Sequence, residues 1–567
     1  MEKHWVFLEK PEPSSVEALS NALNINNYLA SILVQRGVDS FEKAKDFFRP
    51  SLDQLHDPFL MKDMEKAVNR LCDAVHSNEK ILIYGDYDVD GTTSVALAFQ
   101  FLKQFTNNID YYIPDRYAEG YGISKQGMEY AAENGFQLVI TLDCGIKAHT
   151  NVGIAKELGL DVIICDHHLP GESLPEAFAV LDPKRADDHY PFKELSGCGV
   201  GFKLMHGFCL QNTVPLSKLF QLLDLVAVSI ASDIVPIIGE NRILTYYGIK
   251  KLSKSPSPGL KSLIKISGLK VPLSISDVVF YIGPRINAAG RLTHAKESVR
   301  LLVAEGEEEL ESFADHLNAK NTERKDFDQS ITAEALEMIE ESQQLMEAKT
   351  TVLFKETWHK GVVGIVASRC IEKYYRPTII LTESNGKISG SARSVDGFNV
   401  YEAIKSCETL LDQYGGHMHA AGLSLTKENL IPFQNRFEEV VSQSIKADQL
   451  IPKVTVDIEV DFDFINFKTL KIINQMAPFG PKNLQPLFMT KRLKIKDKAK
   501  VIKEQHLKFS VYQEEHNKTF EAIGFGLAHK IDLINKAKSL KMVYHIDLNE
   551  YRGNKTIQLI IKDIKED

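Results

Sequence analysis

Three aspartates at alternate positions crowd one short stretch, YGDYDVDG, at residues 84–91. Asp86, Asp88 and Asp90 follow an apolar run, KILI, that predicts a buried strand, and they precede apolar residues at helical spacing. Carboxylates this close repel one another, and a bound cation makes the same cluster favourable. A solvated turn explains the motif as well, because aspartate and glycine are common turn formers. The rest of the chain must therefore decide between a metal site and a turn.

Two more predicted strands end in groups that bind metals. Asp143 ends QLVITLD, and Asp166, His167 and His168 end DVIICDHH. Ligands of parallel sheets bind beyond the carboxyl ends of the strands, so we expect these groups to meet the aspartate cluster at one edge of the sheet. Asp233 ends an apolar helical run in VAVSIASDIVP, where the helix dipole disfavours an acid. It is therefore either a polar residue at a helix exit or a further ligand.

The types of these side chains indicate which metal they would hold. A mixture of Asp and His without Cys suits Mn²⁺ or Mg²⁺ better than structural zinc. Two such ions about 4 Å apart form the clamp used for phosphoester hydrolysis, where they neutralise charge that develops on the phosphate. The combined pattern therefore predicts a two-metal phosphoesterase site.

The elements that must position this site read as an α/β domain over residues 76–245. Short apolar strands at KILIYG, DYYIP, QLVITLD, DVIICD and FAVLDP alternate with helical segments. This alternation predicts a parallel sheet with helices on both faces.

The remaining chain divides into four predicted segments. Residues 1–75 are helical, and residues 246–350 form a helical connector that becomes heavily charged toward its end. A second α/β domain follows at 351–445, with strands at TVLFKE, PTIILT and KISGSAR. Residues 450–567 are rich in short strands and predict a small barrel or sandwich.

Bulk composition sets limits on the class of protein. With 567 residues, 44% hydrophobic and 25% charged, the chain predicts a globular protein of several domains without a bilayer-spanning segment. The N-terminus lacks a secretory signal, and the seven cysteines lack paired or zinc-type spacing, so we expect a reducing, cytoplasmic location. Because the net charge is −9, binding of nucleic acid would require locally concentrated basic residues.

At the level of whole motifs, the sequence resembles the DHH phosphoesterase family. GDYDVDG, LDCG and DHH occur in the family's order, and GVVGIVASR, GSARSVDGFNVYEAI and GGHMHAAG are similar to its second domain, DHHA1. SGCGVGFKL, ASDIVP and PRINAAGRL resemble the family's single-strand-specific exonucleases. The likeness runs from about residue 50 to 565. It implies an α/β fold with two α/β lobes (DHH and DHHA1) joined by a long helix, plus a C-terminal OB-fold β-barrel.

The resemblance also assigns roles at the predicted metal site. It implies five metal ligands, namely Asp88 on one ion, Asp143 bridging both, and Asp90, His167 and Asp233 on the second. Asp86 and Asp166 are implied to be supporting carboxylates that orient the ligands. His168 would contact the scissile phosphate and protonate the leaving oxygen. Two positions depart from the family pattern, which usually has His at Tyr84 and often Asn at Asp182.

Four motifs carry candidate groups for binding the nucleic-acid backbone. By similarity these are Arg116 in PDRYAEGYG, Arg285, Asn287 and Arg291 in PRINAAGRL, Ser391, Arg393 and Ser394 in GSARS, and Gly415, Gly416 and His417 in GGHMHAAG. Arginine forks match phosphate oxygens, and backbone N–H groups at a predicted helix start after the two glycines would receive a phosphate. Without the resemblance, a surface arginine and a ligand-free glycine turn explain these motifs as well.

A row of lysines near the C-terminus has an independent physical argument. In KRLKIKDKAKVIK the lysines alternate with other residues, so a strand would place them on one face; they are Lys494, Lys496, Lys498 and Lys500. Such a row would form a track for nucleic acid, or it would protect an edge strand from pairing with another sheet. The sequence leaves both interpretations open.

The resemblance implies a metal-dependent 5′→3′ exonuclease of DNA repair and recombination. It would hydrolyse single-stranded DNA to mononucleotides with two Mn²⁺ or Mg²⁺ ions. The implied partners are single-stranded DNA, a helicase and a single-strand-binding protein, with no membrane association and a monomeric chain. Two alternatives remain, a DHH phosphodiesterase acting on short oligonucleotides or small nucleotides, and an inactive DNA-binding homologue.

Overall fold

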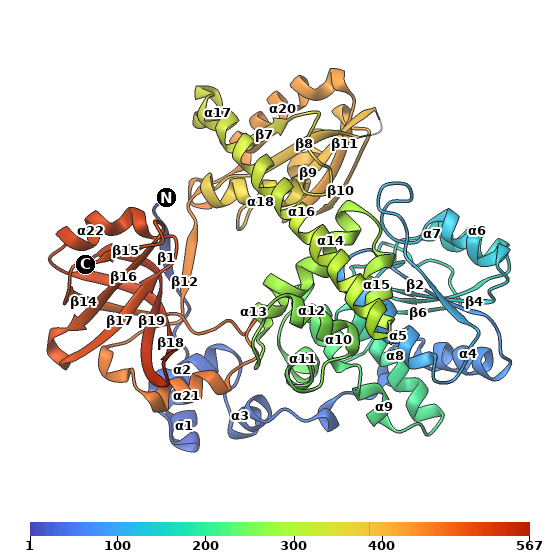
Figure 1. The fold of residues 1–567 in the computed structure, drawn as a ribbon, viewed down its shortest axis with the longest axis horizontal. Helices are drawn as coiled ribbons and strands as arrows, with labels where there is room; N and C mark the ends of the chain where they lie inside the picture. The colour runs from blue at the N-terminus through green and yellow to red at the C-terminus, as the bar shows by residue number, and fades with distance from the viewer. Residues whose placement is uncertain (385) are drawn as a thin grey trace. The chain divides into compact units, whose positions relative to one another are not determined.

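The computed structural model describes residues 1–384 and 386–567, and the chain divides into two compact units (Figure 1). The larger unit comprises residues 8–320 and 457–567, and the smaller unit comprises residues 1–7 and 321–456. The division falls inside the long helix α16 (Glu307–Glu340), which therefore joins the two units. Among the described residues, no helix combines the length and the apolar character needed to cross a membrane.

A five-stranded parallel sheet in the larger unit carries the predicted metal ligands. Its strands are β2 (Ile81–Gly85), β3 (Ile109–Tyr112), β4 (Leu138–Leu142), β5 (Asp161–Cys165) and β6 (Ala179–Leu181). All five were predicted, and they pair in the order β3-β2-β4-β5-β6. The chain leaves β2 for β3 on one side and returns to β4 on the other. The topological switch, where such sheets bind ligands, thus lies between β2 and β4.

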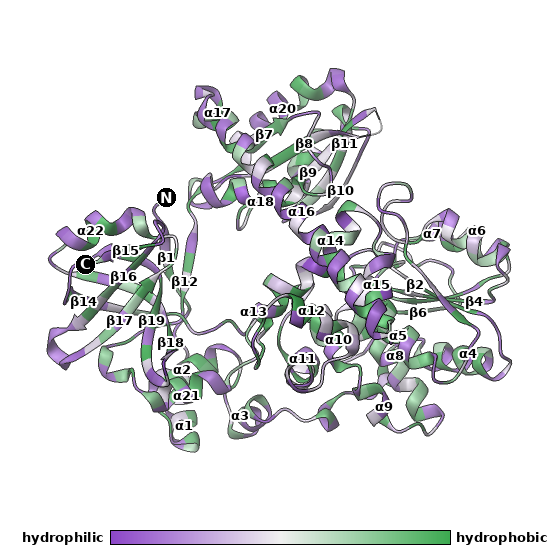
Figure 2. Ribbon diagram, in the orientation of Figure 1, coloured by the Kyte–Doolittle hydropathy of each residue, from purple (hydrophilic) through white to green (hydrophobic). Residues whose placement is uncertain are grey.

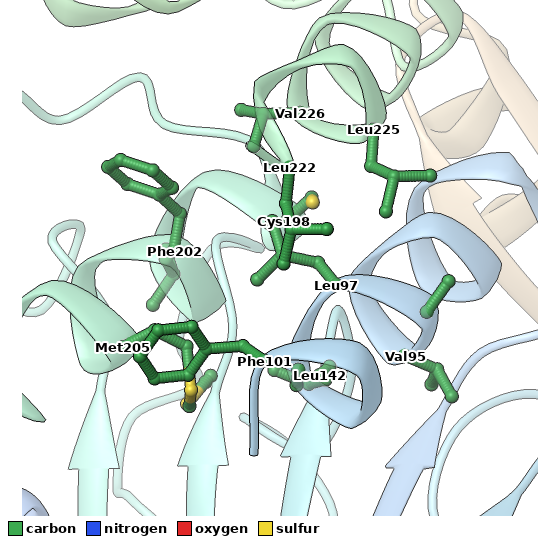
Figure 3. Close-up of a cluster of buried hydrophobic side chains, with 14 of the residues drawn as sticks. Val95, Leu97, Phe101, Leu142, Cys198, Phe202, Met205, Leu222, Leu225 and Val226 are labelled. Atoms are coloured by element: carbon green, nitrogen blue, oxygen red, sulfur yellow. The ribbon is translucent and has the colours of Figure 1, made fainter. Parts of the chain in front are cut away.

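Helices cover both faces of this sheet because its strands are apolar on both sides (Figures 1 and 2). Ile81 and Ile83 of β2 pack into one core, and Leu82 and Tyr84 pack into a second core on the opposite face. The helices are α4 (Met64–His76), α5 (Val89–Leu102) and α8 (Gly197–Gln211) on the first face, and α6 (Lys125–Glu133) and α7 (His149–Glu157) on the second. Figure 3 shows side chains of α5 and α8 together in the first core.

A series of helices leads from this domain toward α16. It begins with α10 (Leu223–Ser232) and α11 (Gly239–Lys254), which pack against each other and against the parallel-sheet domain. It continues through α12 (Pro258–Ile266), α13 (Ile275–Asp277), the π-helix η3 (Val278–Ile282), α14 (Gly283–Leu292) and α15 (Lys296–Val303). The charged stretch before residue 350 is one long helix, α16, followed by α17 (Gln343–Glu347).

The C-terminal strands form a closed barrel within the larger unit. Seven strands pair in the order β13-β14-β18-β19-β17-β16-β15, and an additional β14–β16 pairing closes the sheet. Their bounds are β13 (Ile458–Glu459), β14 (Phe488–Ile495), β15 (Lys500–Ile502), β16 (His506–Gln513), β17 (Lys518–Gly524), β18 (Leu540–Tyr551) and β19 (Asn554–Glu566). The N-terminal helices α1 (Pro13–Leu23), α2 (Asn27–Gln35) and α3 (Phe41–Phe48) share the barrel's hydrophobic core. Sequence periodicity did not predict where these helices pack.

The predicted lysine row does not lie along one strand face. Lys494 is in β14 and Lys500 is in β15, but Lys496 and Lys498 lie in the segment between these strands. Both strands pair with β16. Between the pairs Ile495–Val511 and Lys500–Lys508, the chain that carries the lysines advances by five residues, whereas β16 advances by three. The extra residues bulge out of the ladder, which breaks the alternation. The strand prediction was therefore wrong at this point, and DNA contact by the four lysines stays a prediction.

The smaller unit contains a mixed sheet of five strands. The order is β10-β11-β9-β8-β7, for strands β7 (Thr351–Phe354), β8 (Thr378–Ser384), β9 (Lys387–Arg393), β10 (Gln413–His417) and β11 (Ala420–Leu425). The helices of this unit include α18 (Val363–Lys373), α19 (Val400–Lys405) and α20 (Leu430–Ser444). A short strand, β1 (His4–Phe7), also belongs to this unit and pairs in parallel with β12 (Lys453–Val456).

GGHMHAAG forms a β-hairpin, so the predicted helix start after its two glycines was wrong. Gly415 and Gly416 lie in β10, opposite Gly422 and Ala421 of β11. At Gly416, which has φ +147°, an added Cβ would lie 2.3 Å from the carbonyl oxygen of Ala420. Glycine therefore permits the close approach of two strands here. In the sequence, a pair of glycines with this role looks the same as a pair of glycines in a loop.

A buried ion pair fixes α8 and α11 in the larger unit. Lys203 Nζ lies 2.5 Å from Glu240 Oε1, and both side chains are almost fully buried. Tyr190 donates to the second carboxylate oxygen at 2.6 Å, and the backbone N–H of His56 donates to the first at 3.0 Å. Lys203 also donates to the His56 carbonyl at 2.8 Å. This network holds the segment before α4 against the domain core.

We predict that Lys203→Met lowers the free energy of unfolding by about 3–5 kcal/mol, because it leaves the Glu240 carboxylate buried without its cation. Urea denaturation followed by circular dichroism measures this change. Lys265→Met is the matched control, because the Lys265–Glu311 pair is solvent-exposed and its loss should leave stability unchanged. Equal denaturation midpoints for the Lys203→Met variant and the parent would contradict a stabilising role for the network.

Candidate metal centre

The clustered aspartates lie where β2 leads into α5, at the topological switch of the parallel sheet: Asp86 and Asp88 precede the helix, and Asp90 is in its first turn. Asp88 is the N-cap of α5 and accepts a hydrogen bond from the Gly91 N–H at 3.0 Å. Gly91 is required by space, since an added Cβ would lie 2.4 Å from the Asp86 carbonyl oxygen. Asp143 follows β4 with φ +61°, a left-handed conformation that is uncommon for a non-glycine residue. Such strained backbone is typical of functional sites.

Seven of the predicted site residues come together as overlapping groups of metal-binding atoms. In each group one ligand atom per residue lies within 4.8 Å of the others; the groups are Asp86, Asp88 and Asp143, then Asp90, His167 and Asp233, then Asp143, His167 and His168. His167 Nε2 lies 3.1 Å from Asp143 Oδ1, 3.5 Å from Asp233 Oδ2 and 3.8 Å from Asp90 Oδ2. Asp143 belongs to two of the three groups, as does His167, and through its contact with His167 Nε2 it also adjoins the group of Asp90, His167 and Asp233.

The electrostatics of these groups favour a bound cation. Burial, and then the charges of neighbouring carboxylates, raise the pKa of Asp143 and of Asp86 well above the usual range and also raise that of Asp88. The same causes raise the pKa of Asp233 to about 8. Within the described chain, Asp86 Oδ1, Asp143 Oδ1 and both ring nitrogens of His167 are buried without hydrogen-bond partners. Divalent cations would satisfy these atoms and offset the repulsion, so the residues fit Mn²⁺ or Mg²⁺.

His167 is suited to bind a metal as a neutral imidazole. Burial lowers its pKa to about 4, against the opposing attraction of Asp90. Its ring is therefore neutral at pH 7 and keeps a lone pair for a ligand bond.

Asp90 is oriented by donors from α8 and α10. Its carboxylate accepts hydrogen bonds from the N–H groups of Gly197 at 2.7 Å and Cys198 at 2.8 Å, at the start of α8. The hydroxyl of Ser229 in α10 donates to it at 2.7 Å. An added Cβ at Gly197 would lie 2.5 Å from Asp143 Cβ, so glycine also leaves room for the adjoining carboxylate. Sequence reasoning missed this support, whose only signal is the glycine-rich SGCGVG.

Asp166 supports the two histidines that follow it. One of its oxygens accepts from the His167 N–H at 2.7 Å and bonds His168 Nδ1 at 2.7 Å, while the other accepts from the Ile146 N–H at 2.9 Å. Burial is the largest single effect and disfavours the Asp166 carboxylate, but His168, the Ile146 N–H and His167 together outweigh burial and lower the pKa to about 2. In His168 burial is likewise the largest single effect, but Asp166, Asp233 and Asp88 together outweigh it and raise the pKa to about 9.

His168 presents its second nitrogen to Tyr121, a residue that sequence reasoning missed. Tyr121 Oη lies 3.2 Å from His168 Nε2, and the Tyr121 side chain is largely exposed. The His168 side chain is 44% exposed, so a substrate can reach it. Because Asp166 binds Nδ1, Nε2 is the ring nitrogen that remains to contact Tyr121 or another group.

Tyr84, where the family usually has His, fixes the loop that carries Arg116 and Tyr121. Its hydroxyl donates to the Gly122 carbonyl at 3.0 Å and accepts from the Ser124 N–H at 3.0 Å. Arg116 lies over the Tyr87 ring, with 4.9 Å between guanidinium carbon and ring centroid. The substitution at Tyr84 therefore acts on loop geometry beside the aspartate cluster.

Asp182, the second departure from the family pattern, lies outside the three metal-binding groups. Its Oδ1 accepts a hydrogen bond from the Lys184 N–H at 2.7 Å. Burial raises the Asp182 pKa to about 7.

The PRINAAGRL residues lie on α14 in the larger unit. Arg285 is mostly buried and donates to Asn318 Oδ1 at 3.0 Å and to the Tyr281 carbonyl at 2.8 Å, so its guanidinium braces neighbouring helices. Asn287 and Arg291 are partly exposed, and the Arg291 carbonyl accepts from the Tyr117 hydroxyl.

The candidate phosphate-binding residues of the smaller unit gather at one end of its sheet. Strands β9 and β10 lie on either side of β11, and Arg393 of β9 and His417 of β10 both pair with Ala420 of β11. Arg393 Nη1 donates to Ser391 Oγ at 2.7 Å, and Ser394 lies directly after β9. Gly415, Gly416 and His417 are exposed. Two motifs that are separate in sequence thus share one sheet end.

Family profiles match most of the chain. "DHH family, N-terminal domain" matches residues 80–230, "DHHA1 domain" matches residues 347–443, and "RecJ OB domain" matches residues 456–563. These matches, together with the barrel and the two α/β sheets, confirm the predicted fold class.

Individual relatives match over almost the whole chain. A protein of Bacillus subtilis (strain 168), "Single-stranded-DNA-specific exonuclease RecJ", is 37% identical over 98% of this chain and 70% of its own length. The protein of the same name from Escherichia coli (strain K12) is 34% identical over 89% and 90%. The crystal structure of RecJ in complex with Mn²⁺ from Thermus thermophilus superposes with a TM-score of 0.85 at 25% identity, covering 100% of this chain and 80% of that one.

We predict that Mn²⁺ binds more tightly as pH rises from 6 to 8. The raised pKa values of Asp143, Asp86 and Asp233 mean that the metal-free site holds protons, which the ion must displace. Each proton released steepens the affinity by about tenfold per pH unit. Calorimetry in two buffers of different ionisation enthalpy measures both the affinity and the proton count.

Asp233→Asn serves as the comparison variant, because it removes one raised-pKa carboxylate from the second group. It should bind Mn²⁺ more weakly and with a shallower pH dependence. Affinity that stays constant from pH 6 to 8 would contradict binding at these carboxylates.

Proposed function

The chain belongs to the RecJ family of single-stranded-DNA-specific exonucleases, and we propose that it hydrolyses single-stranded DNA from the 5′ end to mononucleotides. It is a metal-dependent phosphodiester hydrolase that uses Mn²⁺ or Mg²⁺. The observation that carries the assignment is the set of three ligand groups, linked through Asp143 and His167, at the switch point of the sheet. Every expected ligand is present, which favours an active enzyme over an inactive DNA-binding homologue.

We propose that Asp88 and Asp143 hold one ion, and that Asp90, His167 and Asp233, with Asp143, hold the other. Asp86 lies in the same group as Asp88 and Asp143, so it is close enough to support or join the first ion. Bound ions supply Lewis-acid activation of water and neutralise charge on the phosphate. The chain's own contribution is the fixed carboxylate geometry, because Gly197, Cys198 and Ser229 hold Asp90 before metal or substrate arrives.

We propose that His168 contacts the scissile phosphate and gives its Nε2 proton to the departing 3′ oxygen. Asp166 holds Nδ1 and so leaves Nε2 directed toward Tyr121. A fixed orientation of this kind raises the rate, since a proton donor must lie within hydrogen-bond reach of the leaving atom. Tyr121 touches Nε2 in the free protein and would yield this position to the phosphate.

We propose that Ser391, Arg393 and Ser394, with Gly415, Gly416 and His417, bind backbone phosphate and the 5′ end. Support comes from their shared position at one end of the smaller unit's sheet. Arginine forks bind phosphate oxygens in pairs. In the larger unit, Arg116, Asn287 and Arg291 are assigned to the DNA path, and Arg285 acts mainly by fixing α14.

Further DNA contacts are proposed for the barrel. Lys496 and Lys498 are exposed in the bulge between β14 and β15, and Lys500 is exposed at the start of β15. Lys494 is paired with Glu514, which reduces its share in such a track. We also propose a monomeric, cytoplasmic enzyme that works in repair and recombination with a helicase and a single-strand-binding protein. The seven free thiols are consistent with that location.

We predict that Asp143→Ala lowers the cleavage rate by at least about a thousandfold, which corresponds to about 4 kcal/mol of barrier. The reason is that Asp143 belongs to the group of Asp86 and Asp88 and also contacts His167, which belongs to the group of Asp90 and Asp233. Release of mononucleotides from labelled single strands in Mn²⁺ measures the rate, and competition between a 3-mer and a 40-mer distinguishes an exonuclease from a short-oligonucleotide hydrolase.

Asp182→Asn is the matched control for Asp143→Ala. Asp182 is also a buried carboxylate beside the sheet, but it lies outside the metal-binding groups. The control should retain its activity. Near-parental turnover by folded Asp143→Ala protein would remove the two-metal hypothesis.

We predict that Arg393→Ala weakens the preference for a 5′-phosphate over a 5′-hydroxyl by about ten- to a hundredfold. Charge-assisted hydrogen bonds to phosphate contribute about 1.5–3 kcal/mol each. Rates on the two substrates give the preference directly. Arg369→Ala in the same unit is the control, since Arg369 is half-exposed and paired with Glu372. An unchanged preference in the Arg393→Ala variant would clear Arg393 of this role.

A further inference from the structure

The segment that follows Asp233 is strained and is held by residues far away in the sequence. Asp233 is the C-cap of α10, and the next residue, Ile234, has φ +60° and an exposed side chain. A β-branched residue in the left-handed region is a genuine outlier. Such a conformation persists only where contacts with the surrounding structure stabilise it, so the residues that contact this loop must hold it in place.

Residues 476–484, between α21 (Phe467–Gln475) and the barrel strand β14, make the contact. We call this segment the brace. Its Pro481 carbonyl accepts a hydrogen bond from the Ile237 N–H at 2.8 Å. Gly480 packs directly on the Ile237 side chain, because an added Cβ would lie 2.5 Å from Ile237 Cγ1. Ile237 is itself buried in the core of the parallel-sheet domain.

Arg242 in α11 makes a second connection between the brace and the same loop region. It is mostly buried, and it donates to the carbonyls of Ala477 at 3.1 Å and Pro478 at 3.3 Å. It also donates to the Phe47 carbonyl at 2.9 Å, and its guanidinium lies 3.9 Å from the Phe47 ring centroid. The Arg242 guanidinium thus contacts backbone carbonyls and an aromatic face, and it links α11, the brace and the end of α3.

The brace is rigid in its own right. Gly480 and Asn483 exchange backbone hydrogen bonds at 3.0 and 2.9 Å, which closes a tight turn. The buried Asn483 side chain donates to the carbonyls of Met476 at 3.0 Å and Pro478 at 2.8 Å. Arg36 from the N-terminal helices donates to the Leu484 carbonyl at 2.6 Å. A segment fixed at both ends can transmit a constraint to the loop that it contacts.

We propose that the brace is a positioning element that holds Asp233 at the metal site, so that the barrel domain contributes to metal affinity without touching the metal. This positioning role rests on the proposed role of Asp233 as a metal ligand. Displacement of Ile237 by the brace would shift the strained loop, and Asp233 stands four residues before Ile237. Supporting residues around metal ligands typically change metal affinity by about 10–100-fold when they are altered.

Gly480→Ala tests this proposal in the full-length chain, because Gly480 has an ordinary φ and the new methyl group meets Ile237. We expect Mn²⁺ binding, measured by calorimetry, to weaken by about tenfold. The Mn²⁺ concentration for half-maximal cleavage should rise equally, with kcat at saturating Mn²⁺ and KM for DNA within about twofold of the parent. Gly153→Ala in α7 is the matched control, because a Cβ there meets no atom within 4 Å.

An epistasis measurement separates positioning from general destabilisation. In an Asp233→Asn background, Gly480→Ala should weaken Mn²⁺ binding no further, because the brace acts through Asp233. An additional loss there, or Mn²⁺ binding by Gly480→Ala equal to that of Gly153→Ala, would overturn the proposal. If Gly480→Ala fails to fold, Arg242→Met provides the same comparison. A parent protein that binds no Mn²⁺ would instead refute the proposed function.

Discussion

The main constraint on this structure is the mutual repulsion of carboxylates that are buried at one edge of a parallel sheet. Burial and neighbouring charge raise the pKa of Asp86, Asp88, Asp143 and Asp233, so the site is unfavourable to the fully ionised, metal-free protein. Divalent cations reverse that balance, because they neutralise the carboxylates. The repulsion that destabilises the metal-free fold therefore favours metal binding. The strand order β3-β2-β4-β5-β6 concentrates this charge by placing the three ligand-bearing strand ends side by side.

Neutral donors and backbone geometry maintain the cluster until a metal is bound. Asp90 is held by two N–H groups at the start of α8 and by Ser229, while Asp166 orients both histidines. Asp143 is kept in a left-handed backbone conformation, and glycine at position 197 leaves space beside it. These supports come from four different elements, so the site requires that the whole domain be folded.

Much of the fold and of the site was predictable, because strand ends in a parallel sheet obey a simple rule. All five strands of the larger unit's parallel sheet, and the convergence of Asp86, Asp143 and His167, follow from alternating apolar runs that end in acids or imidazoles. At GGHMHAAG the predicted helix start was wrong, because the two glycines allow two strands to approach closely. The lysine row failed because alternation along the sequence does not reveal the bulge between β14 and β15. Contacts between distant segments, such as Tyr121 with His168 or Gly480 with Ile237, leave no periodic signal at all.

We propose that these carboxylates, with His167, form one site for two ions that share Asp143. Anomalous diffraction at the manganese edge, from crystals of the protein soaked in Mn²⁺, tests it most directly. We expect two anomalous peaks, one beside Asp88 and Asp143 and the other among Asp90, His167 and Asp233, with Asp143 in contact with both. A single peak, or two peaks of which only one contacts Asp143, would contradict it.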